Sequence, residues 1–409
     1  MYQTIILGCV LLITLYISKR SRDPKLNMPP LVRYKIPIIG HSFSYLFNCE
    51  EFFKQCRKEY GDIFSLYIWG KVVTLVGKDH FYEVLSKDDS FNFADAFFKL
   101  LPLDIMFRHA DAKDPEIVKN YLINKLSFYA ERMQNCLYST TQEYVGDCNE
   151  PKVIRNVYIM MTRIISNPIA NMLVGEEESQ YEEVIDTFAN FTANAAKILR
   201  FPPFLDFIYP GLHNNIKRII LRLGYNPTDK LQKVLNEHIK RQVYKRLQEK
   251  EKYGDSWKRP KDLLQDIMEE ENFDPNNINY REISDRIGLF VYVSVHTTSN
   301  GCANTLMNLA SRPEYIQELY EEQLEVHKKA DKNGILPFEA IGEMKKLDSF
   351  IKESLRLTGD IAALPHHVLK DYTFSNGLQV PKDHVVDIYF ADTFHDESLQ
   401  GSNPKSFEP

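Results

Sequence analysis

The chain has 409 residues, a length still within reach of one large domain. Hydrophobic residues make up 44% and aromatic residues 12% of it, which excludes a disordered protein. Its net charge of -6, with acidic and basic residues intermixed, excludes the basic surface of a nucleic-acid-binding protein. The six cysteines form no Cys-x-x-Cys pair and no zinc-finger spacing, which is typical of free thiols in a reducing compartment.

Residues 1–23 are predicted to form an N-terminal membrane anchor. The first 18 residues carry no charged side chain, and a helix of that length spans about 27 Å, the hydrocarbon thickness of a thin bilayer. A cleaved signal peptide is the alternative, but Lys19, Arg20 and Arg22 follow the apolar run instead of preceding it. Basic residues on that side place residues 24–409, predicted as one folded domain, in the cytosol.

The first part of this domain predicts a small sheet. Residues 63–68 and 72–76 are rich in β-branched and aromatic residues and flank Trp69-Gly70, so we expect two strands joined by a tight turn. Aromatic residues then gather between Phe91 and Leu103 without a regular period, which predicts a loop with an apolar face. From Pro115 to about Glu322, helical patterns interrupted by prolines dominate.

An aromatic, proline-broken connection between helices is predicted at residues 201–210. It is too apolar for an ordinary exposed loop, so it could dip into a membrane surface or cover an apolar pocket. Asn190-Phe191-Thr192 matches a glycosylation acceptor, but a cytosolic location argues against its use.

Residues 283–309 predict a central helix buried on most of its surface, because the apolar run 289–293 extends past one helix face. His296, Thr297 and Thr298 interrupt it, and threonine hydroxyls in a helix can bond to carbonyls of the preceding turn. Two interpretations stay open from these residues alone. They are a core histidine with two structural threonines, or a functional group of polar side chains.

A second helix is predicted at residues 347–357, where Glu353 and Arg356 lie one turn apart on the same face. Taken alone, such a pair is usually solvated and worth about 0.2–0.5 kcal/mol. Downstream, residues 371–381 predict a hairpin around the Asn376-Gly377 turn, and residues 385–390 a further strand.

Together, the anchor, the central helix with His296-Thr297-Thr298, the Glu353–Arg356 helix and the following strands resemble a cytochrome P450, a heme-thiolate monooxygenase, of the fungal microsomal type. The resemblance covers nearly the whole chain. It implies a mainly α fold, a helical prism with small β-sheets, with heme b as the cofactor. It also implies that Glu353 and Arg356 form a buried structural pair behind the heme.

The resemblance implies roles for two residues of the central helix. In the family this helix carries a small-Gly-x-acid-Thr-Thr motif, whose acid and first threonine manage protons during oxygen activation. Residues 293–298 match it, with Ser294 in place of the glycine and His296 in place of the acid. Thr297 and His296 are therefore the implied catalytic residues, and a histidine can still relay protons near neutral pH.

Two positions after the second helix depart from the family pattern. Where relatives place an arginine that grips a heme propionate, this sequence has His366-His367, and His367 fits the position better. A neutral imidazole is a weaker carboxylate partner than arginine, and adjacent histidines can also be a surface feature. Relatives have glycine where Asp383 stands, so we expect strain in that turn.

Residues 403–409 resemble the segment that leads into the family's heme loop. The Phe-x-x-Gly-x-x-x-Cys-x-Gly loop, which supplies the proximal thiolate, does not follow within the 409 residues, and none of the six cysteines stands in such a context. No metal ligand is therefore predicted. We expect the C-terminal heme-loop part to be missing and the oxygenase activity of this chain to be impaired.

The implied function is hydroxylation of a hydrophobic substrate, of sterol, lipid or terpenoid type, with O2. Electrons would come from NADPH through NADPH–cytochrome P450 reductase as a partner. The implied location is the endoplasmic reticulum membrane, crossed once, with the body in the cytosol and in contact with membrane lipid. The alternative is a catalytically inactive, membrane-anchored fragment or binding scaffold.

Overall fold

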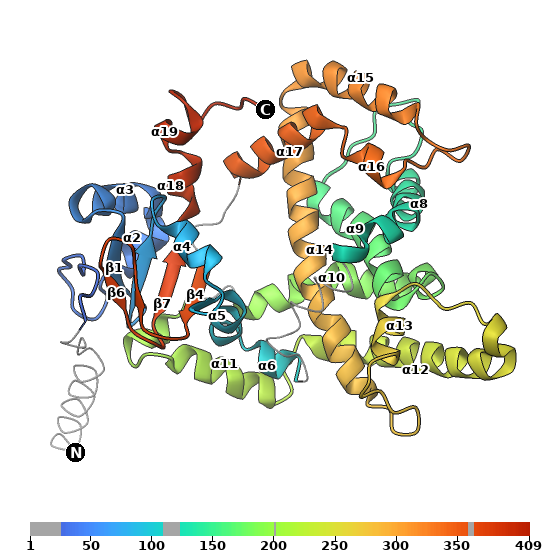
Figure 1. Ribbon diagram of the computed structural model, residues 1–409, viewed down its shortest axis with the longest axis horizontal. Coiled ribbons are helices and arrows are strands. Elements are labelled where there is room, and N and C mark those ends of the chain that lie inside the picture. Colours follow the sequence, from blue (N-terminus) through green and yellow to red (C-terminus); the bar gives the residue numbers. More distant parts are fainter. Residues whose placement is uncertain (1–25, 109–122, 200–201, 359–363) are drawn as a thin grey trace. The chain divides into compact units, whose positions relative to one another are not determined.

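The computed structural model describes residues 26–108, 123–199, 202–358 and 364–409 (Figure 1). Their contacts group into two compact units. Unit 1 comprises the described residues of 26–102, 202–223 and 364–406, and unit 2 comprises those of 103–199, 224–358 and 407–409. The predicted anchor at residues 1–23 lies outside the described residues, and the single domain predicted for residues 24–409 stays a prediction.

Unit 1 is built around a five-stranded sheet with the order β1-β2-β7-β4-β3. Its strands are β1 (Ile63–Ile68), β2 (Lys71–Val76), β3 (Phe91–Asn92), β4 (Leu364–Val368) and β7 (Val385–Ile388). β1 and β2 form the predicted hairpin, and β7 runs parallel to β2 and antiparallel to β4. The second predicted hairpin is present as β5 (Tyr372–Thr373) and β6 (Gln379–Val380), which form a separate two-stranded sheet.

Short helices surround the sheet of unit 1. They are α2 (Ser42–Phe47), α3 (Cys49–Tyr60), α4 (Phe81–Ser86), α5 (Phe93–Leu100), η4 (Phe204–Phe207), α11 (Leu212–Arg222), α18 (Phe390–Phe394) and α19 (Glu397–Gln400). The loop predicted between Phe91 and Leu103 is wrong for most of its length, because α5 occupies it. The side chain of Asn92 caps this helix by accepting a hydrogen bond from the backbone N–H of Asp95 at 2.7 Å, and this local bond outweighs the irregular aromatic pattern.

Unit 2 is almost entirely helical in the part that the structure describes. Its longer helices are α8 (Leu126–Tyr144), α9 (Val157–Val174), α10 (Glu182–Leu199), α12 (Thr228–Tyr253), α14 (Tyr280–Ala310), α15 (Ile316–His327) and α17 (Lys345–Thr358). Short elements connect them: α6 (Leu103–Met106), η2 (Ile123–Lys125), η3 (Glu178–Gln180), η5 (Gly254–Ser256), α13 (Leu263–Met268), η6 (Pro313–Tyr315) and α16 (Phe338–Ile341).

The helix α14 is the axis of unit 2. It is 31 residues long and packs against α9, α10, α12 and α17, and Figure 1 shows it passing the length of this unit. The side chain of Asn279 caps its first turn through the backbone N–H of Glu282 at 3.2 Å. The predicted central helix is therefore confirmed, and with it the mainly helical fold with small sheets.

One helix among the described residues, α9, is long and apolar enough to cross a membrane. Most of it is buried against α8, α10 and α14, so we interpret it as a core helix of unit 2.

Candidate functional site

The middle of α14 carries the threonine singled out by the sequence. The Thr297 hydroxyl donates to the carbonyl oxygen of Val293, one turn back, at 2.7 Å. Thr297 and Thr298 are exposed within the described residues, whereas Val295 and Ser299 on the same helix are buried. The predicted hydroxyl-to-backbone bond is confirmed, and it places the hydroxyl on the open side of the helix.

His296 lies on a different side of α14 from Thr297, because consecutive residues of a helix point about 100° apart. Its Nδ1 is 2.5 Å from the phenol oxygen of Tyr158 on α9, and the two rings meet edge to face with centroids 5.6 Å apart. Tyr158 was not predicted from the sequence. It stands 138 residues before His296, in a helix whose apolar sequence indicates only a core position.

One face of α14 around Thr297 carries small and apolar residues and is partly exposed. Val293, Thr297 and Gly301 follow one another at four-residue spacing and therefore share a face. Val293 is 39% exposed, and Gly301 has no side chain. Leu355 of α17, itself 45% exposed, lies beside Gly301, with Cδ2 3.5 Å from where a Cβ atom would stand. Such a face can receive a flat, apolar group.

Glu353 and Arg356 of α17 form the predicted ion pair. Arg356 donates from Nε and Nη2 to the two carboxylate oxygens, each at 2.7 Å, and the two side chains are only 10% and 12% exposed. The hydrogen bond from Arg356 lowers the pKa of Glu353. One oxygen also accepts the backbone N–H of Glu408 at 2.8 Å. The pair is therefore structural, because it joins α17 to the last residues of unit 2.

Those last residues are also held by aromatic packing. The ring of Phe407 meets that of Phe350 on α17 at a centroid distance of 4.9 Å, and the Arg312 guanidinium lies 4.1 Å from the centre of the Phe407 ring. Arg312 also acts on the charge of Glu353, so it adds a second cation to this cluster.

In unit 1, His367 of β4 is buried and belongs to a charged cluster. Lys99 Nζ, from α5, lies 2.8 Å from His367 Nε2 and 3.1 Å from Nδ1. The carboxylates of Asp95 and Asp383 lie 3.5 and 3.3 Å from the ring. Sequence reasoning missed Lys99, although it is the single basic residue among residues 91–103 and so stood out in an apolar segment.

The neighbouring His366 differs from His367. Burial lowers its pKa, and its Nδ1 lies 3.0 Å from the carbonyl oxygen of Leu364. His366 is therefore a neutral residue of the sheet, and His367 is the better candidate for binding an anion, as the sequence indicated.

Asp383 adopts a left-handed backbone conformation, with φ of +65°. This region suits glycine, because it lacks the Cβ atom that other residues must accommodate there. The strained turn expected at this position is therefore present, directly before β7 and beside His367.

The described cysteines provide no evident thiolate. Burial raises the pKa of Cys302 on α14 and of Cys136 on α8, and it raises that of Cys49 to about 11 and of Cys56 to about 12. Such thiols stay protonated at neutral pH and are poor metal ligands. The described residues also contain no group of three or more His, Cys, Asp or Glu side chains that could hold a metal ion.

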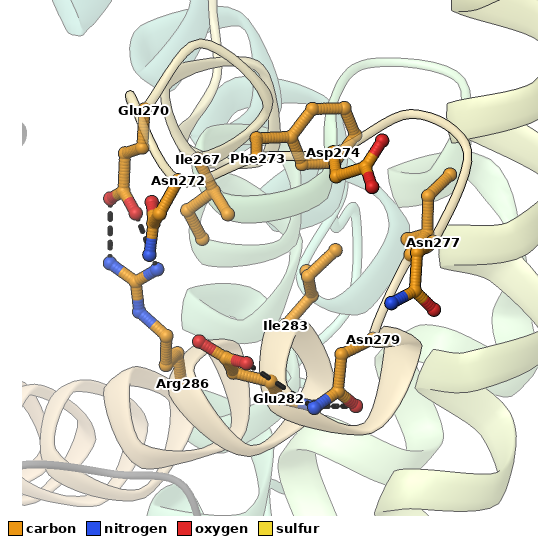
Figure 2. A pocket seen from close by; sticks show the side chains of 11 residues that line it. Ile267, Glu270, Asn272, Phe273, Asp274, Asn277, Asn279, Glu282, Ile283 and Arg286 are labelled. Atoms are coloured by element: carbon orange, nitrogen blue, oxygen red, sulfur yellow. Dashed lines mark hydrogen bonds and ion pairs between the residues drawn. The ribbon is translucent and has the colours of Figure 1, made fainter.

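A polar pocket of about 130 Å³ lies at the start of α14, away from its middle (Figure 2). Arg286 reaches from α14 to Glu270 and donates to both carboxylate oxygens, at 2.8 and 2.7 Å. Figure 2 shows this pair on one side of the pocket and Asn279 with Glu282 on another. The bonds fasten the loop after α13 to the first turns of α14, which is a structural task.

Comparison with known proteins gives one family. The cytochrome P450 family model matches residues 29–409. The chain is 25% identical to a lanosterol 14-alpha demethylase of Cunninghamella elegans over 399 residues, which cover 94% of this chain and 72% of that protein. It is 31% identical to the cytochrome P450 monooxygenase janQ of Penicillium janthinellum over 252 residues, which cover 60% of this chain and 46% of that protein.

A solved structure, the cyanobacterial CYP120A1 with bound retinoic acid, shares the fold with a TM-score of 0.62 at 18% identity. That alignment covers 94% of this chain and 82% of the other. The family match over residues 29–409, the paired Glu353 and Arg356, and the threonine in the middle of α14 lead to one conclusion: the chain belongs to the cytochrome P450 family of monooxygenases.

Proposed function

We propose that this protein inserts one oxygen atom of O2 into a hydrophobic substrate, of sterol, lipid or terpenoid type. Electrons would come from NADPH through NADPH–cytochrome P450 reductase. The observation that carries the proposal is Thr297, whose hydroxyl bonds to Val293 on the open face of α14 that also carries Gly301. A polar group at this point serves proton delivery better than it serves packing. Thr297 and His296 are the proposed catalytic residues.

Heme b is the cofactor that the family implies, and the residues of unit 2 fit its apolar body. The residues that would hold its ring are Val293, Thr297 and Gly301 of α14, with Leu355 beside Gly301. When bound, the heme supplies the oxygen chemistry. The carbonyl oxygen of Val293 holds the Thr297 hydroxyl at a fixed position.

For unit 1 we propose separately that His367 and Lys99 bind a carboxylate, the group that a heme propionate would offer. Lys99 stands at hydrogen-bond distance from His367, so a lysine and an imidazole together face an incoming anion. The carboxylates of Asp95 and Asp383 offset part of this charge.

The 409 residues do not supply the cysteine thiolate that would hold the heme iron in this family. None of the six cysteines stands in the family's heme-loop sequence, and burial keeps Cys302 protonated. We propose that the 409 residues alone do not form a thiolate-ligated heme and are impaired as an oxygenase.

Location at the endoplasmic reticulum membrane, with the body in the cytosol, is also part of the proposal. Unit 1 exposes an apolar surface from α2 and from η4 with the residues after it: Phe43, Phe47, Phe204 and Ile208 are 44%, 77%, 48% and 59% exposed. Phe207 packs against Trp69 and Phe43, which joins the two segments. A patch of this kind can rest on lipid beside the predicted anchor.

Heme binding and the carbon monoxide spectrum test the proposal. The 409-residue chain is compared with a chimera that continues after Pro409 with the corresponding C-terminal part of the Cunninghamella elegans demethylase. We expect the red-shifted complex typical of thiolate-ligated heme from the chimera and not from the 409-residue chain. A chimera that folds, by circular dichroism, but binds no heme would overturn the assignment and favour a binding scaffold.

Membrane placement is tested on microsomes. Protease should digest the region after Lys19 while residues 1–18 stay with the membrane. Protection of that region, or a glycan on Asn190, would contradict the proposed topology.

A further inference from the structure

Tyr158 stands in the first turn of α9 and touches the middle of α14. Its phenol oxygen lies 2.5 Å from His296 Nδ1, and the ring planes are inclined at 82°. Because α9 packs along α14, the two backbones hold the two rings in register. The hydrogen bond and the edge-to-face contact together fix both the position and the rotation of the imidazole.

The bond at Nδ1 has a consequence for the proton of His296. A neutral imidazole carries one proton, on either Nδ1 or Nε2, and the partner of one nitrogen decides which tautomer is present. A phenol is a good donor, so Nδ1 is favoured as the acceptor. The proton of the imidazole then belongs on Nε2.

We propose that Tyr158 is a positioning residue for His296: its hydroxyl donates a hydrogen bond to Nδ1 and thereby favours the tautomer that carries its proton on Nε2. The inference rests on the proposed function, in which His296 delivers protons. It assigns proton delivery to Nε2 of His296. It also adds Tyr158, on α9, as a residue that positions a catalytic side chain of α14. Without the phenol, this hydrogen bond no longer favours one tautomer or one ring orientation.

Nitrogen NMR of the 409-residue chain labelled with ¹⁵N-histidine tests this directly and needs no heme. His296→Gln identifies the His296 signals. In the unaltered chain we expect the Nδ1 resonance of an unprotonated nitrogen and the Nε2 resonance of a protonated one. Tyr158→Phe should average the two resonances toward each other. Tyr244→Phe is the matched control, because it removes a phenol that bonds to Gln248 on the surface of α12.

A protonated Nδ1 in the unaltered chain, or unchanged His296 signals in Tyr158→Phe, would overturn the inference. In the heme-loaded chimera that continues after Pro409, Tyr158→Phe should also lower product per NADPH about two- to tenfold, the factor for one lost hydrogen bond. A ratio equal to that of Tyr244→Phe would contradict the positioning role. If no variant forms product, the proposed function fails, while the tautomer measurement still decides the role of Tyr158.

Discussion

Arg356 donates hydrogen bonds to both carboxylate oxygens of Glu353, each at 2.7 Å, one turn away on α17. The same carboxylate accepts the backbone N–H of Glu408. Taken alone, the spacing of Glu353 and Arg356 predicts a solvated surface pair. In the structure the pair is nearly buried and joins a helix to a segment distant in sequence.

Glu353→Ala should therefore destabilise the protein by about 3–5 kcal/mol, because it removes the carboxylate to which the nearly buried Arg356 donates two hydrogen bonds. Urea unfolding at pH 7 measures the change. Asp348→Ala is the matched control, because Asp348 pairs with Lys352 on the exposed side of the same helix. Equal losses for the two variants would show that burial of the Glu353 pair contributes nothing.

The contribution of Glu353 should also depend on pH. Because its pKa is lowered in the folded protein, the stabilisation is present above the unfolded value of 4.5 and is lost as the pH falls through the folded value.

Asp387 on β7 should make the stability of the folded protein vary with pH in the opposite direction from Glu353. Its Oδ1 is buried without a hydrogen-bond partner among the described residues, and burial raises its pKa from 3.8 to about 7. The folded state therefore binds its proton more tightly than the unfolded state, and this group costs stability as the pH rises from about 4 to about 7.

Asp387→Asn should accordingly stabilise the protein above pH 7, by on the order of 2–4 kcal/mol, with the gain vanishing near pH 4. Unfolding free energies across this range measure it. Asp396→Asn is the control of opposite sign, since the hydrogen bond from Lys78 lowers the pKa of Asp396 to about 2. A gain for Asp387→Asn that does not vary with pH would refute the ionisation argument.

Because the backbone at Asp383 is left-handed, we expect the stability of the protein to depend on the size of the side chain at this position. Asp383→Gly removes the Cβ atom, whereas Asp383→Ala keeps it and loses the polar group that helps aspartate in this conformation. Both variants lose the contact with His367. We therefore expect the glycine variant to be more stable than the alanine variant by about 1 kcal/mol, measured as the difference in thermal midpoint. The reverse order would show that the turn is not strained.

Thr297→Val keeps the shape of the side chain and removes the hydroxyl that bonds to Val293. In the heme-loaded chimera that continues after Pro409, we expect NADPH consumption to continue while product falls and peroxide rises, because proton delivery is impaired. His296→Leu should slow both NADPH use and product formation.

The control for this experiment is Thr162→Val. Thr162 makes the same kind of hydroxyl-to-backbone bond, to Ile159 on α9. If Thr297→Val leaves product per NADPH unchanged relative to Thr162→Val, both histidine and threonine belong to the core interpretation left open by the sequence.

Much of the fold was predictable because its signals are local. The hairpin of β1 and β2, the long α14 and the Glu353–Arg356 spacing each depend on residues close in sequence. The helix α5 was not predicted, because its aromatic residues lack a helical period and the decisive bond is a cap at Asn92. The contacts of Lys99 with His367 and of Tyr158 with His296 were not predicted, for another reason. Each pair joins residues more than a hundred positions apart, and only the packing of separate elements brings them together.

The pairing of β2 with β7 sets the order in which the chain can be completed during synthesis. Thr74 of β2 is bonded through its hydroxyl to His384, 310 residues later, immediately before β7. A ribosome must therefore make the chain as far as Ile388 before the central strand of this sheet exists. Until then one edge of the first hairpin stays unpaired, and exposed strand edges are sites of aggregation. We expect nascent chains of this protein to need chaperone protection at their N-terminal hairpin long after that hairpin has left the ribosome.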